Sequence, residues 1–168
     1  TDADAARAHA ATLQADGRTA LVQPYDAGIA AGETALVFLA GRQSHAFIKG
    51  PLLPAPGGSL AMDESGTYAE EQLLPADPEF ELWDVGYAAL VAAAAHLGLE
   101  PTEFLYARVD IIGDRTDPRL LELELVEPSL GWRQLGETER VLAQRQFALG
   151  VQSALDRLGL GPLSHRRP

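Results

Sequence analysis

The sequence contains no cysteine, which excludes disulfides, thiol catalysis and cysteine-based zinc sites. Because chains without cysteine need no oxidising compartment, a cytoplasmic location is the default expectation. No apolar run approaches the ~20 residues that a membrane span needs, and the first ten residues, TDADAARAHA, lack a signal-peptide pattern. We therefore expect a soluble protein without a membrane partner.

Positive charge is also scarce. Thirteen Lys and Arg stand against 24 Asp and Glu, so the formal net charge is −11, and Lys49 is the only lysine. Since the overall field repels polyphosphates, nucleic acid is not expected as a partner, and any phosphate ligand needs local cations or a bound metal. The phosphate-loop pattern GxxxxGK[ST], the dinucleotide pattern GxGxxG and the serine-hydrolase pattern GxSxG are all absent.

Length and periodicity predict one domain over 1–168, with an α+β fold in which an antiparallel sheet is flanked by helices. Apolar spacing predicts helices over 1–16, 79–97 and 137–158. Alternation predicts strands over 19–25, 33–39, 44–49, 104–112 and 119–126, with 40–43 as a hairpin turn.

Each of the two longer helices carries a predicted core-facing stripe. In the helix over 79–97 it consists of Trp83, Tyr87, Leu90, Val91, Ala94 and Leu97. In the helix over 137–158 it consists of Val141, Ala148, Val151, Leu155 and Leu158. The proline-rich and glycine-rich segment 50–78 has no such periodicity, so we expect a long loop there, the candidate for a lid. Residues 159–168 form a tail whose end, SHRRP, we expect to be disordered.

Acidic residues gather on the last predicted pair of strands. Because side chains alternate along a strand, Arg108 and Asp110 share one face, and Glu122 and Glu124 share a face of the next strand. If the leucines between them pack on the core, three carboxylates converge and need a cation. Mg²⁺ is a natural candidate because it prefers oxygen ligands. The alternative is a solvated face of an acidic protein, and the pattern alone leaves both open.

Alternation also places His45, Phe47 and Lys49 on one face of a strand, so the ammonium and the imidazole are expected to point into the same space. A strand-end lysine in water and a structural histidine are the alternatives.

The order of these motifs resembles the C-terminal half of an ATP-grasp ligase. The strongest elements are Arg108-Val109-Asp110, then Glu122-Leu123-Glu124, followed by Pro128. They are most similar to the bacterial glutathione synthetase type and to the actinobacterial subgroup of cycloserine-biosynthesis cyclo-ligases. The resemblance implies ATP and Mg²⁺ as cofactors, with Asp110, Glu122 and Glu124 as metal ligands and Arg108 beside the transferred phosphoryl group.

Weaker matches extend the resemblance toward the N-terminus. Val22, Gln23, Pro24 and Tyr25 look like the hinge that reads adenine, and Glu33 stands where the family binds the ribose hydroxyls. Lys49 falls where relatives have a basic residue facing phosphate or the acceptor carboxylate, so the resemblance implies a catalytic role for it together with Arg108.

The implied reaction phosphorylates a small-molecule carboxylate with ATP, after which an amine displaces the phosphate. The family's N-terminal half, with its phosphate-binding lysines and glycine-rich loop, has no counterpart in these 168 residues. It is therefore an expected partner, and the isolated chain is expected to be inactive. Glu124 replaces an asparagine of glutathione synthetases, and 57–61 lacks their Arg-Asn pair, which argues against glutathione as the product. Two alternative functions stay open: a non-catalytic nucleotide-binding or interaction module, and a plain structural domain. A homo-oligomer also stays open.

Overall fold

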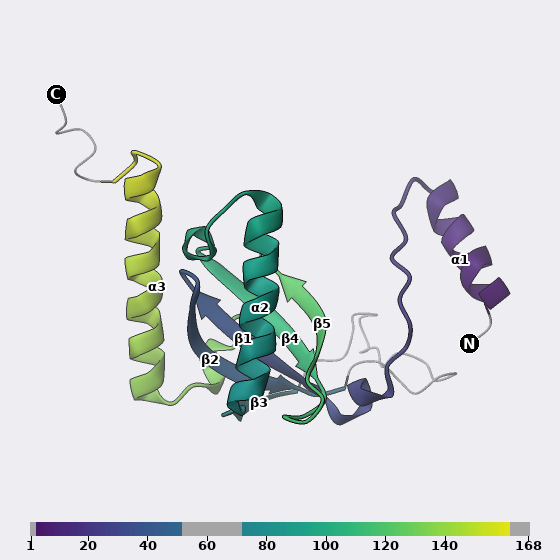
Figure 1. Ribbon diagram of the computed structural model, residues 1–168, viewed down its shortest axis with the longest axis horizontal. Coiled ribbons are helices and arrows are strands. Elements are labelled where there is room, and N and C mark those ends of the chain that lie inside the picture. The colour runs from purple at the N-terminus through teal and green to yellow at the C-terminus, as the bar shows by residue number, and fades with distance from the viewer. Residues whose placement is uncertain (1–2, 52–71, 162–168) are drawn as a thin grey trace, which may run out of the picture.

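The computed structural model describes residues 3–51 and 72–161, and it confirms an α+β fold (Figure 1). Three α-helices, five strands and three short 3₁₀ helices (η) occur in these residues. In chain order they are α1 (Ala3–Ala15), η1 (Ala27–Ala31), β1 (Glu33–Leu39), β2 (Arg42–Lys49), β3 (Leu73–Ala76), α2 (Phe80–Leu97), η2 (Pro101–Glu103), β4 (Tyr106–Ile112), β5 (Arg119–Glu124), η3 (Trp132–Gln134) and α3 (Glu137–Arg157).

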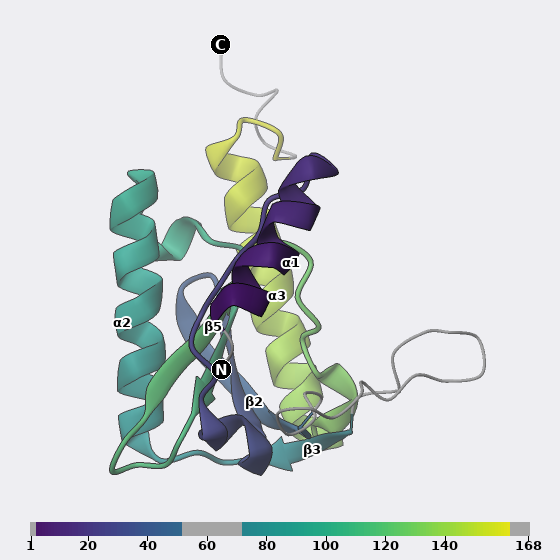
Figure 2. The same cartoon turned by 90° about the vertical axis from the view of Figure 1, so that its right-hand side faces the viewer.

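The five strands form one antiparallel sheet in the order β3-β2-β1-β4-β5. Figure 2 shows α2 and α3 on opposite sides of this sheet. The central strand β1 alternates between the two sides: Leu36 and Phe38 belong to the core under α2, whereas Val37 and Leu39 belong to the core under α3. Because both faces of β1 are covered, every residue from 35 to 39 is fully buried.

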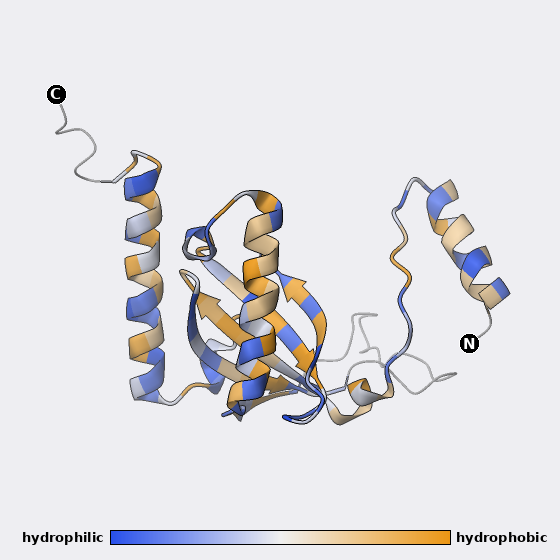
Figure 3. Cartoon of the chain, in the orientation of Figure 1, coloured by the Kyte–Doolittle hydropathy of each residue, from blue (hydrophilic) through white to orange (hydrophobic). Residues whose placement is uncertain are grey.

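The face that α2 turns toward the sheet matches the predicted stripe in part, at Trp83, Leu90 and Ala94. Its buried residues are Leu82, Gly86, Leu90 and Ala94, while Tyr87 and Leu97 of the predicted stripe are exposed. Gly86 permits a close approach, since a Cβ there would lie 2.6 Å from Leu36 Cδ1. Figure 3 shows mostly apolar colours along α2 after its first turns, so periodicity singles out no one face there.

For α3 the predicted stripe is wrong. Val141, Leu155 and Leu158 are exposed, and the buried residues are the small Ala143 and Gly150. Phe147 packs beside Ala143 on the same core. The face of α3 toward the sheet thus combines the small residues Ala143 and Gly150 with the partly buried ring of Phe147.

Residues 19–25 do not form the predicted strand. No strand of the described residues pairs with this segment, and Leu21 and Val22 are largely exposed. Pro24 also lacks the N–H group that a ladder hydrogen bond requires. The apolar residues follow a strand pattern, but within 3–51 and 72–161 no other strand pairs with them.

The hairpin between β1 and β2 is tighter than predicted. Its turn consists of Ala40 and Gly41, both with positive φ, at 49° and 73°. These angles suit the two-residue turn that matches strand twist, and Arg42 already pairs with Leu39. The register shifts after Val37, because Ser44 is an extra residue in β2.

Part of the segment predicted as a loop over 50–78 is a strand. Residues 73–76 form β3, which pairs with the end of β2 so that Leu73 lies opposite Lys49. Pro75 is tolerated because β3 is an edge strand. The predicted lid at 52–71 and the predicted disorder of 162–168 lie outside the described residues. In the part of the chain that is described, no helix is long and apolar enough to cross a membrane.

Candidate functional site

Six charged residues meet on the α3 side of the sheet, toward the end away from the turn at 40–41. We call them the charged cluster: Glu33, Lys49, Arg108, Asp110, Glu122 and Glu124. Strand register brings them together, because Glu33 lies opposite Lys49, Asp110 opposite Glu122, and Arg108 opposite Glu124. These residues come from four strands, β1, β2, β4 and β5.

Asp110 is the centre of the charged cluster and is fully buried. Its Oδ1 accepts a hydrogen bond from Arg108 Nε at 2.8 Å. Its Oδ2 accepts from Arg108 Nη2 at 2.9 Å and from Lys49 Nζ at 2.8 Å. Two cations thus hold both oxygens of one carboxylate, which offsets the cost of burying its charge.

Lys49 bridges Asp110 and Glu33. Its Nζ donates to Glu33 Oε2 at 2.9 Å, and the lysine side chain is only 9% exposed. Burial by itself lowers the pKa of Lys49, but the hydrogen bonds and charges of Asp110 and Glu33 more than reverse this effect, so its pKa lies above the ordinary value. Lys49 is therefore protonated at neutral pH, and its ammonium forms an ion pair with the Glu33 carboxylate.

The three carboxylates predicted from the hairpin converge. Asp110, Glu122 and Glu124 each present an oxygen, and these oxygens lie within 4.8 Å of one another. Burial first, and then repulsion by Glu124 and Asp110, raises the pKa of Glu122. Arg108 Nη2 lies 2.7 Å from Glu124 Oε1 and 3.9 Å from Glu122 Oε2. The site thus concentrates negative charge around one guanidinium.

His45 does not join Lys49, although both lie on the predicted face. His45 Nε2 donates to the carbonyl oxygen of Leu130 at 2.6 Å, so Nδ1 accepts from Ser44 Oγ at 2.9 Å. Burial lowers the pKa of His45. The prediction that the Lys49 ammonium and the His45 imidazole point into the same space is wrong, because the imidazole is hydrogen-bonded to Leu130 in the loop before η3.

Part of the predicted adenine hinge, Val22 to Tyr25, lines a hollow that includes no residue of the charged cluster. Val22, Gln23 and Pro24 line a hollow whose other wall is the Ala3–Ala10 side of α1. Tyr25 is partly exposed, and Asp26 follows it as the cap of η1. Sequence reasoning missed Asp26, whose partner Arg119 is 93 positions away.

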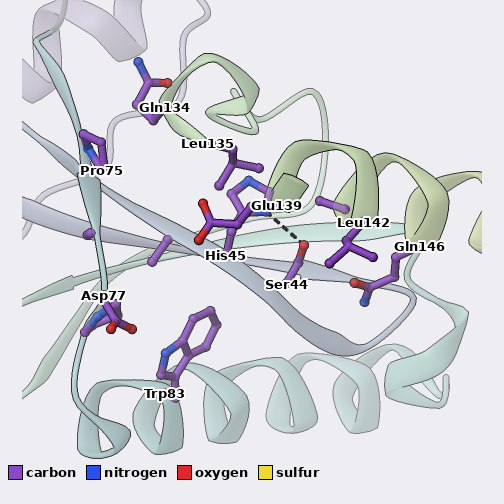
Figure 4. A pocket seen from close by; sticks show the side chains of 14 residues that line it. Ser44, His45, Pro75, Asp77, Trp83, Gln134, Leu135, Glu139, Leu142 and Gln146 are labelled. Atoms are coloured by element: carbon purple, nitrogen blue, oxygen red, sulfur yellow. Dashed lines mark hydrogen bonds between the residues drawn. The ribbon is translucent and has the colours of Figure 1, made fainter. Parts of the chain in front are cut away.

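A separate cavity of about 590 Å³ lies between α2, α3 and the outer edge of β2 (Figure 4). Several of its polar groups already have protein partners: His45 as above, Gln146 with the carbonyl of Leu39, and Glu139 with the N–H of Gly136. These groups are committed to the fold, so the charged cluster remains the candidate for chemistry.

Comparison with known proteins shows that this chain is similar to one protein in both sequence and structure. No protein-family profile matches the sequence. The chain is 39% identical over 130 residues to the cycloserine biosynthesis protein DcsG of Streptomyces lavendulae, which covers 76% of this chain and 41% of DcsG. The crystal structure of the D-cycloserine synthetase DcsG superimposes with a TM-score of 0.68 at 32% identity, over 88% of this chain and 46% of that one.

A D-alanine–D-alanine ligase from Bacillus anthracis shares the fold, with a TM-score of 0.52 at 14% identity over 92% of this chain and 48% of that ligase. These relatives are ATP-grasp ligases. The chain shares sequence and fold with part of DcsG, and the fold alone with part of the D-alanine–D-alanine ligase, which confirms the resemblance to the C-terminal half of an ATP-grasp ligase. DcsG is similar to this chain in both sequence and structure. The chain spans less than half the length of each of these relatives.

Proposed function

We propose that the protein is an ATP- and Mg²⁺-dependent ligase that joins a carboxylate to an amine or a related nucleophile through an acyl phosphate. The observation that carries this proposal is the convergence of Asp110, Glu122 and Glu124 around Arg108. It occurs in a chain that is 39% identical over 130 residues to DcsG. The similarity to a D-cycloserine synthetase favours a substrate derived from an amino acid and argues against glutathione as the product.

The charged cluster fits Mg²⁺ in its donor set. All three candidate ligands offer carboxylate oxygens, which Mg²⁺ prefers. The pKa of Glu122 is raised by burial and by its acidic neighbours, so a nearby cation would relieve the repulsion. Asp110, Glu122 and Glu124 would hold the ion, and when bound it would neutralise charge on the ATP phosphates.

The protein side chains have separate tasks in this proposal. Arg108 presents a guanidinium beside the three carboxylates, where it stabilises charge that develops on the transferred phosphoryl group. Lys49 and Glu33 hold Asp110 in place, a role that their hydrogen bonds favour over direct contact with phosphate or ribose. Val22 to Tyr25 provide the adenine-binding segment.

A second candidate is a nucleotide-binding module without catalysis. One observation favours it: Lys49 and Arg108, the two cations of the charged cluster, are already paired with carboxylates. Phosphates would have to compete with these pairs for the same donors. Binding of MgATP without any release of ADP would support this candidate.

The test uses the protein expressed from its complete gene. ADP release is measured with ATP, Mg²⁺ and a panel of amino-acid carboxylates, and hydroxylamine is added to trap an acyl phosphate as a hydroxamate. We expect both signals to require Mg²⁺ and to be lost in Asp110→Asn. Asp114→Asn, which changes an exposed acid in the adjoining turn, is the matched control. ADP release that is equal in Asp110→Asn and wild type would contradict the proposal.

A further inference from the structure

Asp26 ends the extended segment that carries the proposed adenine hinge. Its Oδ1 accepts from the backbone N–H of Gly28 at 2.8 Å and so caps η1. The same carboxylate binds the Arg119 guanidinium at two points, Nε to Oδ2 at 2.9 Å and Nη2 to Oδ1 at 3.0 Å. This two-point geometry defines orientation as well as distance, because the fork of the guanidinium matches the carboxylate.

Arg119 is the first residue of β5 and is itself held in place. Its Nη1 donates to the backbone carbonyl of Asp117 at 3.1 Å and to the Asp117 carboxylate. Gly28 brings the backbone of η1 close, since a Cβ there would meet Arg119 Nη2 at 3.0 Å. Glu122 lies three residues after Arg119 in β5, and Glu124 lies two residues after Glu122. One guanidinium thus connects the hinge segment to the strand with two proposed metal ligands.

Among residues 3–51 and 72–161, few other contacts define the position of the hinge segment relative to the sheet. Residues 18–26 form no helix or strand, and Leu21 and Val22 are largely exposed. The hollow that Val22, Gln23 and Pro24 line is shared with α1, a helix without buried residues. The 3₁₀ helix η1 lies beside the end of β4 and the start of β5 (Figure 1). Asp26, at the N-terminus of η1, is bonded there to Arg119.

We propose that Arg119 and Asp26 are a positioning pair that sets the adenine-binding segment relative to the metal-binding strand. This inference rests on the proposed function. ATP is recognised at two ends, adenine and phosphates, so a binding site must hold both contacts at a defined separation. A preformed separation spares the ligand the cost of ordering the segment, which increases affinity for the whole nucleotide without changing affinity for the metal.

The test compares variants of the protein expressed from its complete gene. Both side chains are about one-third exposed, at 37% and 36%, so the effect is modest. Arg119→Gln is expected to weaken ATP binding roughly two- to fivefold and to leave Mn²⁺ binding without nucleotide unchanged. Asp26→Asn preserves an acceptor for Gly28 and is expected to match Arg119→Gln, and the double variant is expected to be no weaker than either.

Two further variants sharpen the result. Arg115→Gln removes the same charge from an exposed site in the adjoining turn, and it is expected to bind ATP like wild type. Arg119→Lys retains the charge but loses the two-point geometry, so we expect an intermediate affinity. If Arg119→Gln binds ATP as tightly as Arg115→Gln, the positioning role is refuted. An equal loss of Mn²⁺ and ATP binding would also refute it, since the pair would then serve the fold as a whole. Wild-type protein that binds neither Mn²⁺ nor ATP would overturn the proposed function itself.

Discussion

Replacing Lys49 by methionine removes the cation that joins Glu33 to Asp110. The side chains of Lys49, Glu33 and Asp110 are 9%, 12% and 1% exposed, so water cannot replace the lost charge well. Removing one partner of a buried ion pair typically costs about 3–5 kcal/mol. Because Arg108 still binds both oxygens of Asp110, we expect the lower end, about 3 kcal/mol.

The assay is urea and thermal unfolding at neutral pH. A loss of about 3 kcal/mol corresponds to a Tm decrease of roughly 6–12 °C for a chain of this size. The matched control is Arg42→Met, which removes an exposed cation from the other end of β2 and is expected to change stability by less than about 0.5 kcal/mol.

The pH dependence follows from the pKa of Lys49, which lies above its ordinary value of 10.5 in the folded protein. A cation with a raised pKa contributes its full stabilisation below the unfolded pKa and loses it only as pH rises through the folded pKa. The difference between wild type and Lys49→Met is therefore expected to be constant between about pH 6 and pH 9. A Lys49→Met variant as stable as Arg42→Met would show that Lys49 does not compensate the buried carboxylates.

Three further predictions concern other parts of the chain. Glu122→Gln is expected to raise Tm at neutral pH, because a carboxyl group with a raised pKa destabilises the fold once ionised. Thermal scans at about pH 4 should show no difference, and added Mg²⁺ should raise Tm in wild type alone. Gly86→Ala is expected to lose roughly 1–3 kcal/mol in urea unfolding, since its Cβ would lie 2.6 Å from Leu36 Cδ1, and equal stability would contradict the packing. The 168-residue chain expressed alone is expected to bind ATP with Kd of ~1 mM or weaker and to form no ADP, because its net charge is −11; micromolar affinity by calorimetry would contradict this.

The convergence of carboxylates could be predicted from sequence because it depends on a local rule. Side chains alternate along β4 and β5, and the short connection between these strands favours antiparallel pairing. This rule predicts Asp110, Glu122 and Glu124 on one face, and the structure places one carboxylate oxygen of each within 4.8 Å of the others. Their roles as metal ligands stay a prediction.

The sequence could not predict which charged residues form ion pairs with one another. Lys49 and Asp110 lie 61 positions apart, and Asp26 and Arg119 lie 93 apart. Such contacts depend on strand order and on the path of η1, which no local pattern encodes. The same limitation explains why His45 was expected beside Lys49 but instead binds the carbonyl of Leu130.

By itself the sequence determined the α+β class, the positions of the helices and the antiparallel hairpins, because these depend on periodicity and turn residues close together in the chain. Only the tertiary structure decided that 73–76 become an edge strand and that 19–25 do not. It also selected the small residues Gly86 and Ala143 as helix contacts. The physical reason is that strand pairing and helix packing require a partner surface, and that surface exists only once distant segments have met.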